Sequence, residues 1–252
     1  MMNTRLQLHI GTETPHLITV SGELDYENCQ KLDSAFERVI GQCGVRLDLE
    51  LGELDFVDSS GVRVLIVGAQ DAQAAGCTVR ILSMNPQLDH ILTVAGVRHL
   101  FDFDCGHMER NVWEIDPSSN IQSTFSIPGD IKSCCDGRDK ICDFAYYIGF
   151  RSPILDDIRL AAGESLSNAV RHGNCCGGLI RVHCVQSDDG LAISLEYTSN
   201  RFDPESVPVP NMADPPTGGM GIHFMRLIMD GVDYKFAEDS VVLTLVKKWV
   251  RE

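Results

Sequence analysis

The sequence predicts two domains, an α/β domain followed by an α+β domain, and three observations support this. Over residues 1–104, strand-like and helix-like periodicities alternate, as expected for an α/β domain. Over residues 105–122 the periodicity lapses and turn-forming residues gather, which is typical of a linker. Over residues 123–252, helices and paired strands return in a different order. With 252 residues, each domain has enough chain to bury a core of its own.

The elements of the first domain follow from the spacing of its apolar residues. Strands alternate apolar and polar residues, whereas helices repeat apolar residues every three or four positions. A glycine after a helical stretch, as at Gly44 and Gly76, marks its end. In order, these patterns predict a strand at 16–25, a helix from 26 to 43, a strand at 45–51, a helix beginning after Asp58, a strand at 77–83, a short helix at 88–95 and a strand at 99–103.

The second domain is read in the same way. Pro153 suits the first turn of a helix, because the N–H that proline lacks has no partner there. A stretch with several prolines, 203–216, is too broken for regular structure and predicts a loop. The remaining patterns predict a strand at 123–130, helices at 131–150 and 153–172, a hairpin of strands at 179–186 and 191–197, a helix at 218–229 and a closing hairpin at 234–237 and 240–246.

Charge and composition exclude several classes of function. The chain has 21 basic and 36 acidic residues and a formal net charge of −15, which disfavours direct binding to nucleic acid or to an anionic membrane. No stretch of about 18 apolar residues predicts a membrane span, and the start lacks the pattern of an export signal. We therefore expect a cytoplasmic protein.

The ten cysteines are scattered and, without an export signal, are expected to be reduced. One cluster of His and Cys residues offers a zinc site as a minor alternative. It has no Cys-x2-Cys pair, and its vicinal cysteines fit a tetrahedral site poorly. The cluster consists of His172, Cys175, Cys176, His183 and Cys184.

Two motifs in the first domain carry a family resemblance. GELD, residues 22–25, follows a strand, and FVDSSG, residues 56–61, stands at a strand-to-helix turn. In order and spacing they resemble the STAS domain of anti-sigma-factor antagonists over nearly all of residues 1–104. The resemblance implies that Ser59 is the phosphorylated serine and that Asp25 and Asp58 lie on the surface that binds the partner. Because serine is common at helix N-caps, a purely capping Ser59 remains the alternative.

The physical chemistry of a helix start agrees with a phosphorylation site. Backbone N–H groups and the helix dipole tolerate negative charge there, so phosphorylation need not unfold the domain. A phosphate adds about −1.5 to −2 charges beside Asp58, which is enough to repel an acidic partner.

In the second domain, Glu164 and Asn168 stand four residues apart and so share one face of a helix. Further along, Gly218, Gly219 and Gly221 lead into another helix, where a backbone without Cβ atoms can approach a phosphate. With FDP at 202–204, this order resembles the GHKL ATPase fold, a Bergerat α/β sandwich, in its anti-sigma-factor serine kinase branch.

The resemblance implies roles for these residues and for the cofactors ATP and Mg²⁺. Asn168 would coordinate Mg²⁺, Glu164 would act as the catalytic general base, and the three glycines would bind the nucleotide phosphates. Mg²⁺ would bridge the phosphates and offset charge as the γ-phosphoryl group leaves.

One position departs from this family. In LEYTSNRFDP, residues 195–204, Tyr197 stands where the family carries an Asp that accepts a hydrogen bond from the adenine amino group, and Ser199 and Arg201 replace glycines. Losing such a charge-assisted bond costs about 1.5–3 kcal/mol, or roughly 10- to 150-fold in affinity. Glu196 and Asp203 are the candidate substitutes, but Glu196 alternates to the opposite face of the strand from Tyr197 and is not expected to serve.

Together, these resemblances predict a cytoplasmic partner-switching regulator with a phosphorylatable STAS domain and an ATP-dependent serine protein kinase domain. Its partners would be STAS-domain proteins, a sigma factor or another regulator. A homodimer and a monomer both remain open, as does phosphorylation of Ser59 in cis or in trans. The alternative is a non-catalytic docking protein with a degenerate nucleotide site. A histidine kinase fragment is disfavoured, because nothing supplies a dimerisation helix with a phospho-accepting His.

Overall fold

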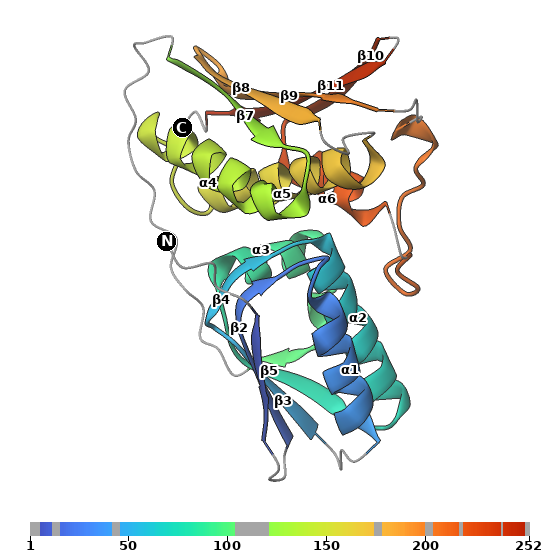
Figure 1. Ribbon diagram of the computed structural model, residues 1–252. Coiled ribbons are helices and arrows are strands. Elements are labelled where there is room, and N and C mark those ends of the chain that lie inside the picture. The colour runs from blue at the N-terminus through green and yellow to red at the C-terminus, as the bar shows by residue number, and fades with distance from the viewer. Residues whose placement is uncertain are drawn as a thin grey trace. The chain divides into compact units, whose positions relative to one another are not determined.

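The computed structural model describes residues 6–11, 16–41, 46–103, 121–173, 178–199, 204–216, 219–237 and 239–249. The chain forms two compact units (Figure 1), one of residues 1–110 with 210–220 and the other of residues 111–209 with 221–252. Nearly all of the predicted linker, 105–122, lies outside the described residues, so its boundaries stay predictions. Among the described residues, no helix is long and apolar enough to span a lipid bilayer.

The first unit is a mixed sheet with helices, as predicted. The strands follow the order β1-β2-β3-β5-β6, with β4 also paired to β2, and only the β1–β2 pair is antiparallel. Its elements are β1 (Gln7–Ile10), β2 (His16–Leu24), α1 (Cys29–Ile40), β3 (Arg46–Leu51), β4 (Leu54–Val57), α2 (Ser59–Ala74), β5 (Thr78–Met84), α3 (Pro86–Val94), the 3₁₀ turn η1 (Arg98–Leu100) and β6 (Asp102–Phe103).

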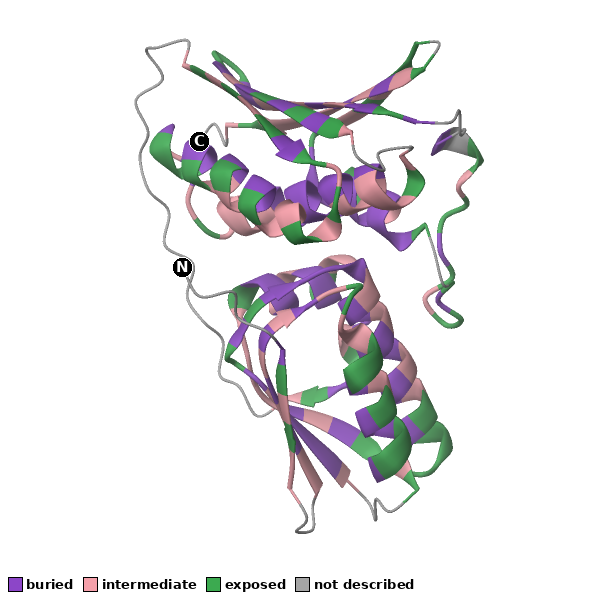
Figure 2. Cartoon of the chain, viewed as in Figure 1, coloured by how far each residue is buried: buried purple, intermediate pink, exposed green. Residues whose placement is uncertain are grey.

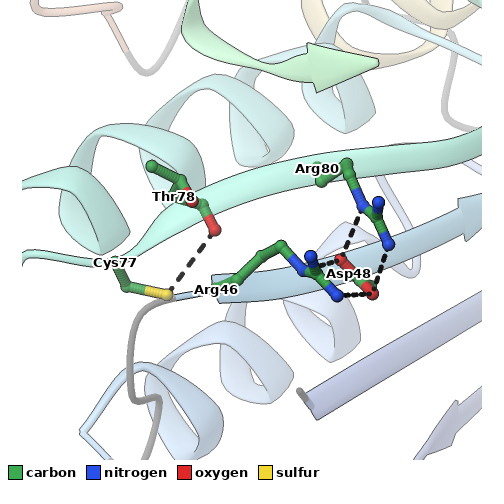
Figure 3. A network of polar contacts seen from close by, with 5 residues as sticks. All are labelled: Arg46, Asp48, Cys77, Thr78 and Arg80. Atoms are coloured by element: carbon green, nitrogen blue, oxygen red, sulfur yellow. Dashed lines mark hydrogen bonds and ion pairs between the residues drawn. The ribbon is translucent and has the colours of Figure 1, made fainter. Parts of the chain in front are cut away.

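The alternation in β3 separates a core face from a face with charged residues. Leu47, Leu49 and Leu51 are fully buried. Asp48 is also buried, at 5% exposure, and is satisfied by two arginines (Figure 3). Arg80 donates to both Asp48 oxygens at 3.1 Å, and Arg46 Nε lies 2.9 Å from Oδ1. Because Arg80 belongs to β5, these contacts connect the two central strands, which periodicity alone does not reveal.

Two short strands, β1 and β4, were not predicted. The predicted strand at 45–51 is confirmed as β3, and after it the chain turns at Gly52, whose N–H donates to Ser83 Oγ at 3.2 Å, and enters β4. β2 is long enough to pair with β3 along 16–19 and with β4 along 22–24. The end of β4 therefore lies beside the end of β2, where the N–H of Asp58 donates to the Leu24 carbonyl at 3.1 Å.

The second unit is an antiparallel sheet in the order β10-β11-β9-β8-β7, with α4, α5 and α6 on one face (Figure 1). The predicted helices and hairpins are confirmed, with ends shifted by a few residues. The elements are β7 (Gln122–Pro128), α4 (Ile131–Tyr147), α5 (Ile154–His172), β8 (Leu179–Ser187), β9 (Gly190–Thr198), the 3₁₀ turn η2 (Pro204–Ser206), α6 (Met220–Ile228), β10 (Gly231–Phe236) and β11 (Ser240–Lys248).

The core of the second unit lies between the sheet and its helices (Figure 2). Alternate residues of the three central strands are buried, which is the pattern of a sheet with one covered face. They include Ile180, Val182, Cys184, Leu191, Ile193, Leu195, Tyr197, Val241, Leu243 and Leu245. As predicted, residues 204–216 carry little regular structure beyond η2 and a turn at Met212–Ala213, where the Asp214 N–H donates to the Asn211 carbonyl at 3.0 Å.

The close approach of α1 and α2 yields a stability prediction. A Cβ on Gly68 would lie 2.5–2.6 Å from the Phe36 ring, whereas one on Gly41 would meet nothing within 4 Å. Gly68→Ala should therefore destabilise the first unit by about 1–3 kcal/mol through overpacking. Gly41→Ala, at a helical φ of −68°, should be neutral or stabilising by about 0.4–1 kcal/mol. Scanning calorimetry of the full chain measures both, and equal melting shifts for the two variants would contradict the packing argument.

Candidate functional site

The first candidate site is the start of α2. Asp58 is the N-cap, and its Oδ1 accepts from the N–H groups of Ser60 and Gly61 at 2.8 and 2.9 Å. Ser59 is the first helical residue and is 6% exposed. The helix thus begins after Asp58, as predicted, but the alternative that Ser59 is the capping side chain is wrong, because Asp58 fills that role.

Asp58 also connects the helix to the turn after β2. Its Oδ2 accepts from the N–H of Tyr26 at 2.9 Å. Within the turn, Asn28 accepts from the Asp25 N–H at 3.1 Å and donates to the Glu23 carbonyl at 2.8 Å. The structure therefore brings Asp25 close to Asp58, and so to Ser59, although 33 residues separate the two aspartates in the sequence.

The turn is electrostatically crowded. The pKa of Asp25 rises from 3.8 to about 6, first because the carboxyl is buried and then because Asp58, Glu23 and Glu27 add negative charge. Burial raises the pKa of the Cys29 thiol, and the negative charges of Asp58 and Asp25 raise it further. A phosphate on Ser59 would add charge to a surface that already disfavours it.

Gly61 is a residue of this site whose role the sequence reading missed. A Cβ there would lie 2.5 Å from the Leu24 carbonyl oxygen and 2.8 Å from Leu24 Cγ. Only glycine lets the first turn of α2 approach β2 this closely. The final glycine of FVDSSG was the available sign of this contact.

The second candidate site lies between α5 and the start of α6. Glu164 is 2% exposed and Asn168 is half-buried. A Cβ on Gly221, the second residue of α6, would overlap Glu164 Oε2 and would lie 3.5 Å from Asn168 Nδ2. Three of the predicted site residues therefore meet, and the space left by the missing Cβ of Gly221 holds the Glu164 carboxylate.

The glycines before α6 shape its start. Gly219 has φ +87°, a left-handed conformation that favours glycine, and α6 begins at the next residue. The free N–H groups of a first helical turn are suited to binding phosphate. Gly218 lies outside the described residues, so its predicted role stays a prediction.

Tyr234 and Arg226 were not anticipated. Burial raises the pKa of Tyr234 to about 12, with Arg226 lowering it and Glu164 raising it further, so both charges act on this hydroxyl. Arg226 also donates to the Pro204 carbonyl at 3.4 Å. No motif marked either residue, because their proximity to Glu164 depends on the placement of β10 and α6.

The departure at Tyr197 is visible in the structure. Tyr197 is 4% exposed and lies on the helix-facing side of β9. Glu196 lies on the other face, where its carboxylate is 3.4 Å from Arg181. Glu196 therefore does not replace the missing carboxylate, as expected from strand alternation, and Asp203 lies outside the described residues.

The donor chemistry at this site suits Mg²⁺ better than zinc. Asn168 and Glu164 offer the oxygen ligands that Mg²⁺ prefers. In the part of the chain that the structure describes, no cluster of three or more His, Cys, Asp or Glu side chains is placed to hold a metal. Of the zinc alternative, Cys175 and Cys176 lie outside that part, and His183 and Cys184 occupy opposite faces of β8.

Comparison with protein families assigns both domains. Residues 11–102 match the model described as "Mlab, STAS domain", and residues 138–247 match the model described as a histidine kinase-like ATPase domain. The STAS domain, the histidine kinase-like ATPase domain and the predicted fold classes are confirmed, whereas the anti-sigma-factor branches of both families stay predictions. No curated protein gave a significant match.

Several solved structures share parts of the backbone. The anti-sigma factor antagonist SpoIIAA in its unphosphorylated form is 19% identical, covers 39% of this chain and 89% of its own, and has a TM-score of 0.35. An anti-sigma factor antagonist from Mycobacterium paratuberculosis is 19% identical, with coverages of 39% and 85% and a TM-score of 0.35. The RsbU and RsbW domains of a Mycobacterium tuberculosis protein are 17% identical, with coverages of 51% and 32% and a TM-score of 0.40. The two family models, not these likenesses, identify the domains.

The raised pKa of Asp25 predicts a pH-dependent stability. A carboxyl whose pKa is raised on folding contributes stability that is present below its unfolded pKa of 3.8 and is lost as the pH rises through about 6. Asp25→Asn should therefore match the wild type near pH 4 and melt at a higher temperature by pH 7. Calorimetry between these pH values checks this, with Asp55→Asn, an exposed position of β4, as control. A gain of equal size at both pH values would contradict it.

Proposed function

We propose that this chain, in which a STAS domain precedes a histidine kinase-like ATPase domain, is a cytoplasmic partner-switching regulator that uses Mg²⁺-ATP to phosphorylate a serine of a STAS domain. One observation carries the proposal: Glu164 and Asn168 meet Gly221 at the start of α6. A carboxylate, an amide and a helix N-terminus are the groups that phosphoryl transfer needs for base, metal and phosphate.

Each residue has a role in this mechanism. Asn168 would hold Mg²⁺, which offsets the charge of the phosphates. The glycines Gly218 and Gly219 and the first turn of α6, with Gly221, would hold the phosphates themselves. Glu164 would accept the proton of the attacking serine hydroxyl.

Ser59 is the proposed acceptor on the STAS domain. Because it is only 6% exposed, its hydroxyl becomes available to a kinase only if the first turn of α2 loosens. Asp58 holds that turn through two accepted hydrogen bonds and accepts a third from Tyr26, so a partner that engages Asp25 and Asp58 would act where the site opens. The added phosphate would then repel an acidic partner surface, such as that of a sigma-factor regulator or of another STAS-domain protein.

A non-catalytic docking protein is the second candidate, and Tyr197 is the observation that favours it. A buried aromatic ring where the purine-binding Asp is expected would weaken adenine recognition. In that case the two domains would bind protein partners without ATP turnover, whether the chain is a monomer or a homodimer.

Incubation of the full chain with γ-labelled ATP and Mg²⁺ tests the kinase proposal. We expect label on Ser59, loss of label in Ser59→Ala, retention in the neighbouring control Ser60→Ala, and a roughly 10²- to 10⁴-fold slower reaction in Glu164→Gln. A mixture of the Ser59→Ala and Glu164→Gln chains becomes labelled only if transfer occurs in trans. If neither the wild type nor added STAS domains become labelled, the kinase proposal fails, and the non-catalytic docking function is the remaining candidate.

Base selectivity separates the two candidates further. With Tyr197 in place of the carboxylate, the wild type should bind fluorescent ADP and GDP analogues within about tenfold of each other. Tyr197→Asp should restore an adenine preference of roughly 10- to 150-fold. Glu196→Gln, on the opposite face of β9, is the control and should change neither affinity. A wild type that already prefers ADP strongly would show that another group reads the base.

A further inference from the structure

Helix α6 has a charged contact at each end. At its start, the Glu164 carboxylate lies against Gly221. At its end, the ammonium group of Lys247 donates to the Ile228 carbonyl and, at 2.7 Å, to Asp157 Oδ2. An anion near the N-terminus and a cation near the C-terminus both interact favourably with the helix dipole. The Lys247 and Asp157 side chains are only 13% and 11% exposed, so water screens this pair weakly.

The contacts at the two ends of α6 are separated by the same number of residues on α5 and on α6. Asp157 and Glu164 lie seven residues apart on α5, and Ile228 and Gly221 lie seven residues apart on α6. Seven residues span about 10.5 Å in either helix. Asp157 is joined to the end of α6 and Glu164 to its start, so the helices run antiparallel, side by side on one face of the sheet (Figure 1).

The anchor at the end of α6 is rigid. Lys247 belongs to β11, which pairs with β9 and β10. Next to it, the Asp230 N–H donates to the Val246 carbonyl at 2.9 Å, and Asp230 Oδ2 accepts from the Lys248 N–H at 2.8 Å. Residues 204–216, before the helix, have little regular structure of their own. Side chains of Arg63, Gln70 and Arg226 donate to carbonyls of this segment, whereas the end of α6 is joined directly to a strand of the sheet.

We infer that the Asp157–Lys247 ion pair positions the phosphate-binding start of α6. A shift of α6 by one turn, about 5.4 Å, would remove Gly221 from Glu164 and Asn168. The pair holds the Ile228 end on α5 and thereby fixes the glycine end, although neither residue contacts Gly221. Asp157 and Lys247 are thus positioning residues for the nucleotide site, and the inference rests on the function proposed above.

The test compares charge removal with charge retention in the full chain. Lys247→Met should weaken binding of a fluorescent Mg²⁺-ADP analogue by about tenfold or more, because it removes the ammonium group that faces the nearly buried Asp157 and that anchors the end of α6. Lys247→Arg keeps the charge and should stay within about threefold of the wild type. The double variant Asp157→Asn/Lys247→Met removes both charges, so the chain keeps no buried carboxylate facing the new methionine and should still fold. It should bind the nucleotide analogue as weakly as Lys247→Met.

Arg181→Met is the matched control, because it breaks the exposed ion pair with Glu196 on the other face of the same sheet. It should leave nucleotide binding unchanged. If the folded double variant binds the analogue as tightly as the wild type, the inference is overturned.

Hydrogen exchange separates this outcome from failure of the proposed function. If the wild type binds no nucleotide, the proposed function fails. The positioning role is then tested by the hydrogen-exchange protection of the amides of residues 224–229. Their protection should fall in Lys247→Met and in the double variant but not in Arg181→Met. Equal protection in all of these variants would refute the role independently of ATP.

Discussion

The contact between the Glu164 carboxylate and the backbone of Gly221 is the constraint around which the second unit is organised. A nearly buried carboxylate needs hydrogen-bond donors or positive potential, and the first turn of a helix supplies both. Glycine at position 221 is the residue that admits this carboxylate, since any Cβ would occupy its place. The lengths of α5 and α6, the anchor at Lys247 and the strand that carries it all serve to hold the two groups together.

The first unit uses the same physical device. The Asp58 carboxylate lies at the start of α2, and the adjacent Gly61 lets that turn approach β2. In both units a carboxylate occupies a helix N-terminus before any phosphate arrives. Under the proposed function, a phosphate at either place would have to share donors with an existing negative charge. The raised pKa of Asp25 shows the strength of this crowding around α2.

Recognition of the base and handling of the phosphates are separable in this fold. Glu164, Asn168 and Gly221 lie together at the start of α6, whereas Tyr197 lies on β9 next to Val241 of β11. A change from carboxylate to phenol on β9 leaves the helix contacts intact, because the tyrosine ring packs in the same buried layer as Leu195 and Leu243. Under the proposed function, the chain would therefore keep its phosphate-binding residues while its recognition of the base is altered.

The sequence by itself determined the two domains, most helices and strands and the family of each domain, because these depend on local periodicity and on short motifs. It also indicated Glu164 with Asn168, which share a helix face at any tertiary arrangement. The pairing of β4 with β2, the hydrogen bond from the Tyr26 N–H to Asp58, the buried network around Asp48 and the proximity of Tyr234 to Glu164 were decided by tertiary structure. Each of these joins residues far apart in the chain, and pairing of that kind depends on which surfaces pack together, which local spacing does not encode.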